Sequence, residues 1–167
     1  MANPTMTLIA SNTVGSGGVA SVTFSSIPAT WTDLVVKASA RQSNANVYGA
    51  INIQLNGTDG GMIFLQGDGA SASSTNNSGV FQPISAGASA TANTFGNVEV
   101  YIPNYTSSNN KSVSSDSLGE NNATTAYSRL VAGNYAVTSA ITSVTFTSNT
   151  GTFVQYSTFY LYGINNS

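Results

Sequence analysis

Ionisable side chains are scarce in this chain, and two residue types that often carry catalysis are missing. Its 167 residues include four Lys or Arg, six Asp or Glu, no histidine and no cysteine. Charged residues make up 6% of the chain, whereas a soluble domain usually has about a quarter. The missing types exclude a Ser-His-Asp triad, a thiol nucleophile, disulfides, and zinc sites of imidazole or thiolate. Most of the surface that contacts water must therefore consist of the neutral residues Ser, Thr, Asn and Gly.

The charge balance also limits the partners that we expect. The four basic residues, Lys37, Arg41, Lys111 and Arg129, are scattered along a chain of net charge −2. No basic stripe is available for phosphates or anionic lipids, so we predict neither nucleic-acid nor membrane binding. No apolar run is long enough to span a bilayer. The opening Met1-Ala2-Asn3-Pro4 has no basic region followed by an apolar one, so we expect no secretory signal.

Alternation of apolar and polar residues dominates the pattern and predicts half-buried strands. Hydrophobic residues make up 41% of the chain, which suits one globular domain covering residues 1–167. We predict ten strands: Thr5–Ala10, Ala20–Ser25, Leu34–Arg41, Ile51–Asn56, Met62–Gln66, Val80–Ile84, Asn97–Ile102, Ser128–Tyr135, Val144–Thr147 and Phe153–Ile164. No segment has a helical period with caps. The fold class is therefore all-β, an antiparallel two-sheet β-sandwich, and within that class we predict a jelly roll.

Turn chemistry separates these strands. Asn56-Gly57 is a strong hairpin signal, and two longer polar stretches, Gly67–Gly79 and Asn104–Lys111, are predicted to be loops. The segment Ala70–Ser78 is the most linker-like part, but it lies between two strands and reads as a long loop. Trp31 precedes a strand, and we expect it to plug one end of the sandwich.

Carboxylates are the remaining candidates for chemistry. A glycosidase needs two carboxyl groups at one bond, and Asp116 and Glu120 are the nearest pair by sequence, although two solvated loop acids is the interpretation we favour. Asn56, Asp59 and Asp68 offer oxygen ligands for calcium, but Asp-Gly turns explain the two acids more simply. We therefore predict no enzyme, no catalytic residue, no cofactor and no metal site.

The tyrosines near the C-terminus are the candidate interface residues. Tyr156, Tyr160 and Tyr162 are expected on one face of the last strand, and Phe153, Phe159 and Leu161 on the other. Such a row would stack on a sugar ring or pack against another subunit, and we favour a subunit interface or the core. Edge strands with so few charged guards would also need covering, so we predict a homo-oligomer docked on a larger assembly.

Several segments resemble structural proteins of tailed bacteriophages. They are Ser26-Ile27-Pro28-Ala29-Thr30-Trp31-Thr32-Asp33-Leu34-Val35-Val36, Ile53-Gln54-Leu55-Asn56-Gly57-Thr58-Asp59-Gly60-Gly61, Leu65-Gln66-Gly67-Asp68-Gly69 with the Ser-rich stretch after it, and Ser157-Thr158-Phe159-Tyr160-Leu161-Tyr162-Gly163-Ile164. That group includes capsid decoration (cement) proteins and components of tails and fibres. The resemblance implies a β-sandwich that is often trimeric, and it brings no catalytic residues with it.

These observations lead to a functional expectation. We expect a non-enzymatic virion structural protein, made in the host cytoplasm, that binds the major capsid protein as a homotrimer and stabilises the capsid surface. The alternative is a receptor- or glycan-binding module of a tail or fibre. A glycosidase that uses only carboxylates is the third interpretation.

Overall fold

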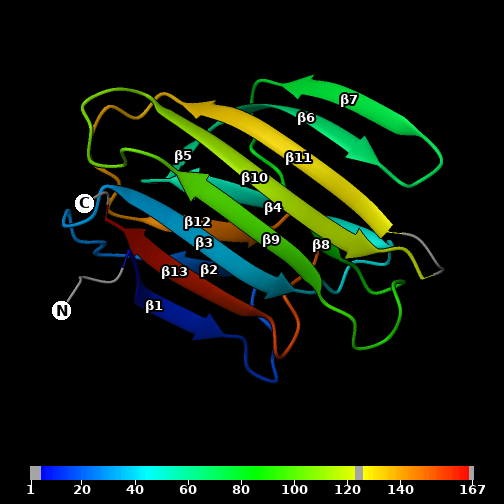
Figure 1. Ribbon diagram of the computed structural model, residues 1–167. Coiled ribbons are helices and arrows are strands. Elements are labelled where there is room, and N and C mark those ends of the chain that lie inside the picture. The colour runs from blue at the N-terminus through cyan, green and yellow to red at the C-terminus, as the bar shows by residue number, and fades with distance from the viewer. Residues whose placement is uncertain (1–4, 123–125, 166–167) are drawn as a thin grey trace.

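Two antiparallel sheets packed face to face make up the computed structural model, which describes residues 5–122 and 126–165 (Figure 1). The all-β sandwich predicted from the sequence is confirmed. The strands are β1 (Met6–Thr13), β2 (Ser21–Phe24), β3 (Asp33–Ala40), β4 (Tyr48–Leu55), β5 (Thr58–Asp59), β6 (Gly61–Gly67), β7 (Ala72–Asn77), β8 (Ile84–Ala86), β9 (Gly96–Ile102), β10 (Lys111–Glu120), β11 (Ala126–Tyr135), β12 (Val144–Ser148) and β13 (Thr158–Ile164).

The strand order is that of a jelly roll with additions. The large sheet has the order β1-β13-β3-β9-β10-β11-β6-β7, and the small sheet has β2-β12-β4-β5, with β8 also paired to β4. Without β5, β6, β7, β10 and β11, eight strands remain in two sets of four, β1-β13-β3-β9 and β2-β12-β4-β8. Consecutive strands of this set lie in opposite sheets, except β4 and β8, which pair with each other in the small sheet, and this is the jelly-roll connection.

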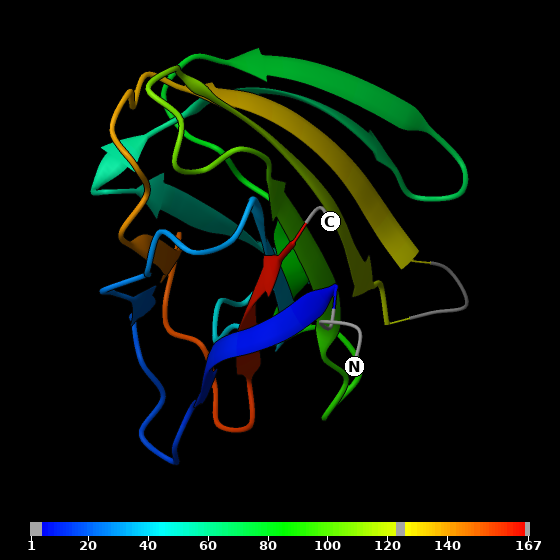
Figure 2. The same cartoon turned by 60° about the vertical axis from the view of Figure 1, so that its left-hand side comes forward.

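Four of the added strands widen one side of the large sheet, whereas the two-residue β5 belongs to the small sheet. Strands β10 and β11 follow β9 in the sheet, and the β6–β7 hairpin continues it to the far edge, which Figure 1 shows opposite β1. Figure 2 shows the turn of this hairpin reaching out to one side of the molecule, away from the small sheet. This added half therefore has an outer face that the eight-stranded jelly roll would not have.

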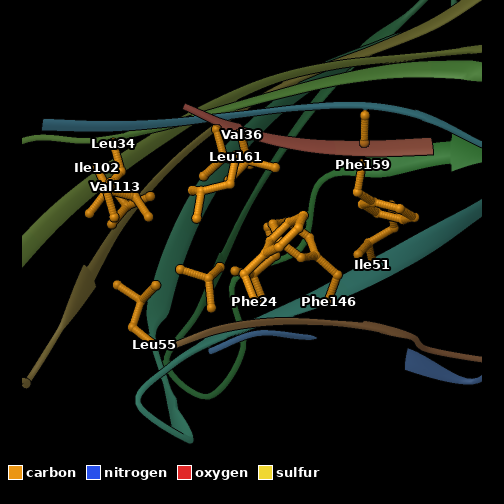
Figure 3. Close-up of a cluster of buried hydrophobic side chains, with 14 of the residues drawn as sticks. Phe24, Leu34, Val36, Ile51, Leu55, Ile102, Val113, Phe146, Phe159 and Leu161 are labelled. Atoms are coloured by element: carbon orange, nitrogen blue, oxygen red, sulfur yellow. The ribbon is translucent and has the colours of Figure 1, made fainter. Parts of the chain in front are cut away.

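The core lies between the two sheets and is built by the predicted alternation. Ile51, Ile53 and Leu55 of β4 are fully buried, and they face Leu161 and other apolar side chains of the large sheet (Figure 3). The ring of Phe146 in β12 lies 5.5 Å from that of Phe159 in β13 and 6.4 Å from that of Phe24 in β2. Outside this stack, the half-buried ring of Trp31 covers Gly163 and packs on the core from the β2–β3 connection, as expected.

Three strands, β5, β7 and β10, were missed by the sequence pattern, and one was misplaced. The predicted loop Gly67–Gly79 contains β7, whose residues are polar because an edge strand of the overhanging sheet is wetted on both faces. Strand β10 gave no signal because Ser115 and Ser117 face inward in place of large apolar residues. These small side chains let β8 approach, and the Ile84 amide donates to the Ser117 hydroxyl. The predicted strand Val80–Ile84 is replaced by β8, which begins at Ile84.

Three of the four basic residues are buried and hold backbone carbonyl groups. Arg41 donates to the carbonyls of residues 88, 90, 91 and 94 in the β8–β9 connection. Lys111 is 1% exposed, donates to the carbonyls of residues 107, 109 and 137, and burial lowers its pKa. Arg129 donates to Gln66 and to the Gln82 carbonyl. Three of the four basic side chains thus bind loop carbonyls to the strands. Lys37 is the only one of the four basic residues that is exposed.

Candidate functional site

The face of the large sheet that points away from the small sheet, here called the outer face, carries the candidate site. Residues directly opposite one another on paired strands lie on the same face of a sheet. One row across the outer face is Ser11, Tyr160, Lys37, Glu99, Asp116, Leu130, Leu65 and Ser74. The next row is Leu8, Tyr162, Val35, Tyr101, Ser114, Ala132, Ile63 and Asn76.

A hollow on the added half of this face, here called the apolar groove, has a volume of about 690 Å³. Its walls include Ile63, Leu65, Tyr101 and Leu130, from strands β6, β9 and β11. Ile63 is 58% exposed, Leu65 63% and Leu130 54%. A second hollow of about 700 Å³ adjoins it and shares Ile63 and Tyr101. Such a cluster of exposed large aliphatic side chains is typical of a surface that another molecule covers.

Tyr101 is a fixed wall of the groove. Its hydroxyl donates to Asp33 at 2.8 Å, and the other carboxylate oxygen of Asp33 accepts from the Asn104 amide at 2.7 Å. Asp33 is 3% exposed, and its hydrogen bond raises the pKa of Tyr101. Because the phenol is held at its tip, the ring presents a preorganised surface to whatever enters the groove.

The charges beside the groove are mostly negative. Glu99 and Asp116 are directly opposite each other on β9 and β10, and both line the groove. Glu99 forms an ion pair with Lys37, and both side chains are about half exposed, so the pair contributes little to stability. The groove thus combines an aliphatic floor with a carboxylate rim, which favours a partner with apolar and neutral or basic groups.

The three tyrosines expected in one row are only partly together. Tyr160 and Tyr162 do lie on the outer face, with ring centroids 6.5 Å apart, while Phe159 and Leu161 point into the core. The expectation that Tyr156 shares this face is wrong, because β13 begins only at Thr158. Tyr156 lies in the preceding turn with φ 71°, and its amide donates to the Val14 carbonyl. Five strand spacings, about 24 Å, separate Tyr160 from Leu65 in the groove.

Asp116 and Glu120, the pair considered for a glycosidase, do not converge. Both belong to β10, where four residues span about 13 Å. The Glu120 carboxylate accepts from the amide and hydroxyl of Thr91. The sequence interpretation that both acids lie in a loop is wrong, because both belong to strand β10. The structure instead brings Asp116 next to Glu99, a cross-strand neighbour that sequence spacing cannot reveal.

The oxygen ligands considered for calcium are also separated. Asn56 and Gly57 form the β4–β5 turn with φ 50° and 75°, and the Asn56 side chain accepts from the amides of Thr142 and Ser143. Asp68 lies at the other end of β6, about 20 Å along the chain, and accepts from the amides of Ala70 and Ser71. Those two backbone hydrogen bonds lower the pKa of Asp68. Within residues 5–122 and 126–165, no three Asp or Glu side chains gather at a metal-binding distance.

The groove residues were visible in the sequence but were not recognised as a surface. Met62, Ile63, Phe64, Leu65 is a run of four apolar residues in a predicted strand, and on a half-buried strand two of them must face outward. Leu130 is exposed although it is aliphatic, and its neighbour Arg129 is buried although it is charged. This is the reverse of the usual distribution of apolar and charged residues on a half-buried strand. An apolar side chain at the position where the alternation predicts a polar one was the available signal.

The exposed aliphatic side chains and the fixed ring of Tyr101 suit the groove to binding another molecule. The described residues contain no helix able to cross a membrane. Comparison with known protein families, with characterised proteins and with solved structures gave no match to this chain.

Proposed function

We propose that this protein is a non-enzymatic virion structural protein that decorates a phage capsid and stabilises it by binding the coat lattice as an oligomer. The phage assignment comes from the sequence resemblance. The observation that carries the binding role is the exposure of Ile63, Leu65 and Leu130 beside one another in the apolar groove. The homotrimer that the resemblance implies remains a prediction.

Burial of this surface provides the mechanism. A subunit that bridges neighbouring coat proteins adds contacts that must break before the shell opens. An interface is usually dominated by a few large apolar or aromatic residues in its centre. Leu65, Leu130 and the fixed ring of Tyr101 have these properties. The Ser and Asn side chains around them are neutral, so removing them from water costs less free energy than removing charged side chains would.

The test uses particles stripped of this protein and variants of the groove. Leu65→Gln and Leu130→Gln change side chains that are mostly exposed, so the free energy of unfolding should move by less than about 0.5 kcal/mol. Each variant should bind stripped particles at least about tenfold more weakly, which corresponds to about 1.4 kcal/mol. The heat-induced release of DNA should also occur at a lower temperature than with the wild-type protein.

Leu8→Gln is the matched control. Leu8 is 51% exposed on the same outer face, but it lies on β1 at the opposite edge of the large sheet. It should bind like the wild type. Wild-type binding by both groove variants would refute the docking role of the groove, and unchanged heat stability of particles that lack the protein would refute the stabilising role.

A glycan-binding module of a tail or fibre is the second candidate, and one observation favours it. The ring of Tyr101 lies in a groove with Asn76 and the carboxylates of Glu99 and Asp116, and an aromatic ring beside polar oxygen and nitrogen groups suits a sugar. This candidate predicts detectable binding on a glycan array that Tyr101→Ala abolishes. A copy number near that of the coat protein would favour decoration instead.

A further inference from the structure

The exposed edges of the two sheets are not equally protected against pairing with another strand. The small sheet ends in β2, with four residues, and in β5 and β8, with two and three. At one edge of the large sheet, β1 is interrupted by a register shift between Leu8 and Ala10. Short edge strands and bulges are the usual guards of a sheet edge.

The other edge, β7, has none of these guards. Its six residues pair with β6 in unbroken register from Met62↔Asn77 to Gly67↔Ala72. Its sequence, Ala-Ser-Ser-Thr-Asn-Asn, contains no charge and no proline, and five of the six residues are exposed. Among the strands of the described chain, β7 packs substantially only on β6.

The hydrogen-bonding pattern shows which backbone groups β7 leaves free. The Asp68 amide donates to the Ser71 carbonyl at the hairpin turn, so residues 68 and 71 are a hydrogen-bonded pair. Such pairs alternate along an antiparallel ladder. Residues 73, 75 and 77 therefore bond to β6, and Ala72, Ser74 and Asn76 point their N–H and C=O groups outward. Within residues 5–122 and 126–165, the backbone groups of Ala72, Ser74 and Asn76 form no hydrogen bond with the backbone of another element.

We propose that β7 pairs with β7 of a second copy of this chain, antiparallel and about a two-fold axis at Ser74. In this register Ser74 is opposite Ser74 of the other copy, and Ala72 is opposite Asn76. All three outward residues then exchange backbone hydrogen bonds, about six in total. Moving the axis to residue 75 or 76 would leave part of this set unpaired within β7.

The side chains are self-complementary in that register. On one face Ser74 meets Ser74, and Ala72 meets Asn76, while on the other face Ser73 meets Thr75, a hydroxyl pair of the kind that stabilises cross-strand contacts. No like charges meet, because β7 has no charged residue. The large sheet becomes continuous across two copies. The two apolar grooves, each lined in part by β7, then lie on either side of the axis.

Single cysteines test the register, since the natural chain contains no cysteine. In Ser74→Cys the two Cα atoms would lie about 5.5 Å apart, within the range for a disulfide. In the control Asn76→Cys, on the same strand and face, the two positions would be about 13 Å apart along the strand. Under mild oxidation Ser74→Cys should run at twice the 17.1 kDa of one chain on non-reducing gels, and Asn76→Cys should not.

A second variant tests the contact without a crosslink. Ser74→Pro removes an outward N–H and no hydrogen bond to β6, so each subunit should keep its far-ultraviolet spectrum, and proline is tolerated on an edge strand. Light scattering on a concentration series should show that the wild type associates in even numbers of chains, as dimers or, where the homotrimer also forms, as pairs of trimers, and that Ser74→Pro loses this pairing. Equal crosslinking of the two cysteine variants, no crosslinking of either, or unchanged association of Ser74→Pro would overturn the proposal. None of these outcomes depends on what the apolar groove binds.

Discussion

Replacing Arg41 by methionine should destabilise the fold far more than an equal loss of charge at the surface. Arg41 is 9% exposed, and its guanidinium donates four hydrogen bonds to carbonyls of the β8–β9 connection, at 2.7 to 3.1 Å. Hydrogen bonds from a charged donor are worth about 1.5–3 kcal/mol each. Simple addition would therefore give about 6–12 kcal/mol, which is an upper bound for the loss.

Two effects reduce that figure. Ala88 and Thr91 are exposed, so water can replace the guanidinium at their carbonyls, while Ala90 is buried and its carbonyl would be left dry. Removing the charge also removes the cost of burying it. One or two unsatisfied carbonyls at about 1–3 kcal/mol each leave an expected loss of about 3 kcal/mol in the free energy of unfolding.

Urea denaturation at pH 7 measures this loss, with Lys37→Met as the matched control. Lys37→Met removes the same charge, but the partner of Lys37, Glu99, is about half exposed. The free energy of unfolding of this control should therefore fall by no more than about 0.5 kcal/mol. Arg41→Lys should lie between the two, because one ammonium group cannot reach four carbonyls in the geometry of a guanidinium. A loss for Arg41→Met below about 1 kcal/mol, or equal to that of the control, would show that the contacts of Arg41 with these carbonyls do not stabilise the fold.

Three further predictions concern the core and the turns. Burial raises the pKa of Tyr135, so above pH 10 the unfolded chain releases the phenol proton while the folded chain keeps it. The free energy of unfolding should therefore fall by up to about 1.4 kcal/mol per pH unit. Urea titrations between pH 9 and 11 should show a smaller slope for Tyr135→Phe. In Gly163→Ala the new Cβ would lie 2.3 Å from the Trp31 ring, so we expect a loss of about 1–3 kcal/mol and changed tryptophan fluorescence, whereas Gly17→Ala, in open space, should have no effect. Asn56→Ala removes the side chain that accepts from the amides of Thr142 and Ser143 and should cost about 1–2 kcal/mol in thermal melts, because φ 50° is also unfavourable for alanine.

The sequence predicted the sandwich well where burial follows simple alternation. Leu161 and Phe159 alternate with Tyr160 and Tyr162, and both the core face and the outer face of β13 were predicted correctly. The prediction failed for β10 and β7. In the first the inward residues are small because β8 packs closely against them, and the second is solvated on both faces.

The candidate site was less predictable than the fold because it depends on strand order. Leu65 and Leu130 become neighbours only when β6 pairs with β11, although 65 residues separate them in the sequence. Glu99 and Asp116 meet for the same reason across β9 and β10. The buried roles of Arg41 and Lys111 were likewise hidden, since nothing local marks a basic residue that binds loop carbonyls.

We propose that the apolar groove on the added half of the large sheet docks on the coat of a virion. A cryo-electron-microscopy map of purified particles would show this contact itself. We expect a subunit on the capsid surface, at a copy number near that of the coat protein, with Leu65, Leu130 and Tyr101 against the coat. Subunits found only on the tail, or bound to the capsid with the groove open to solvent, would contradict it.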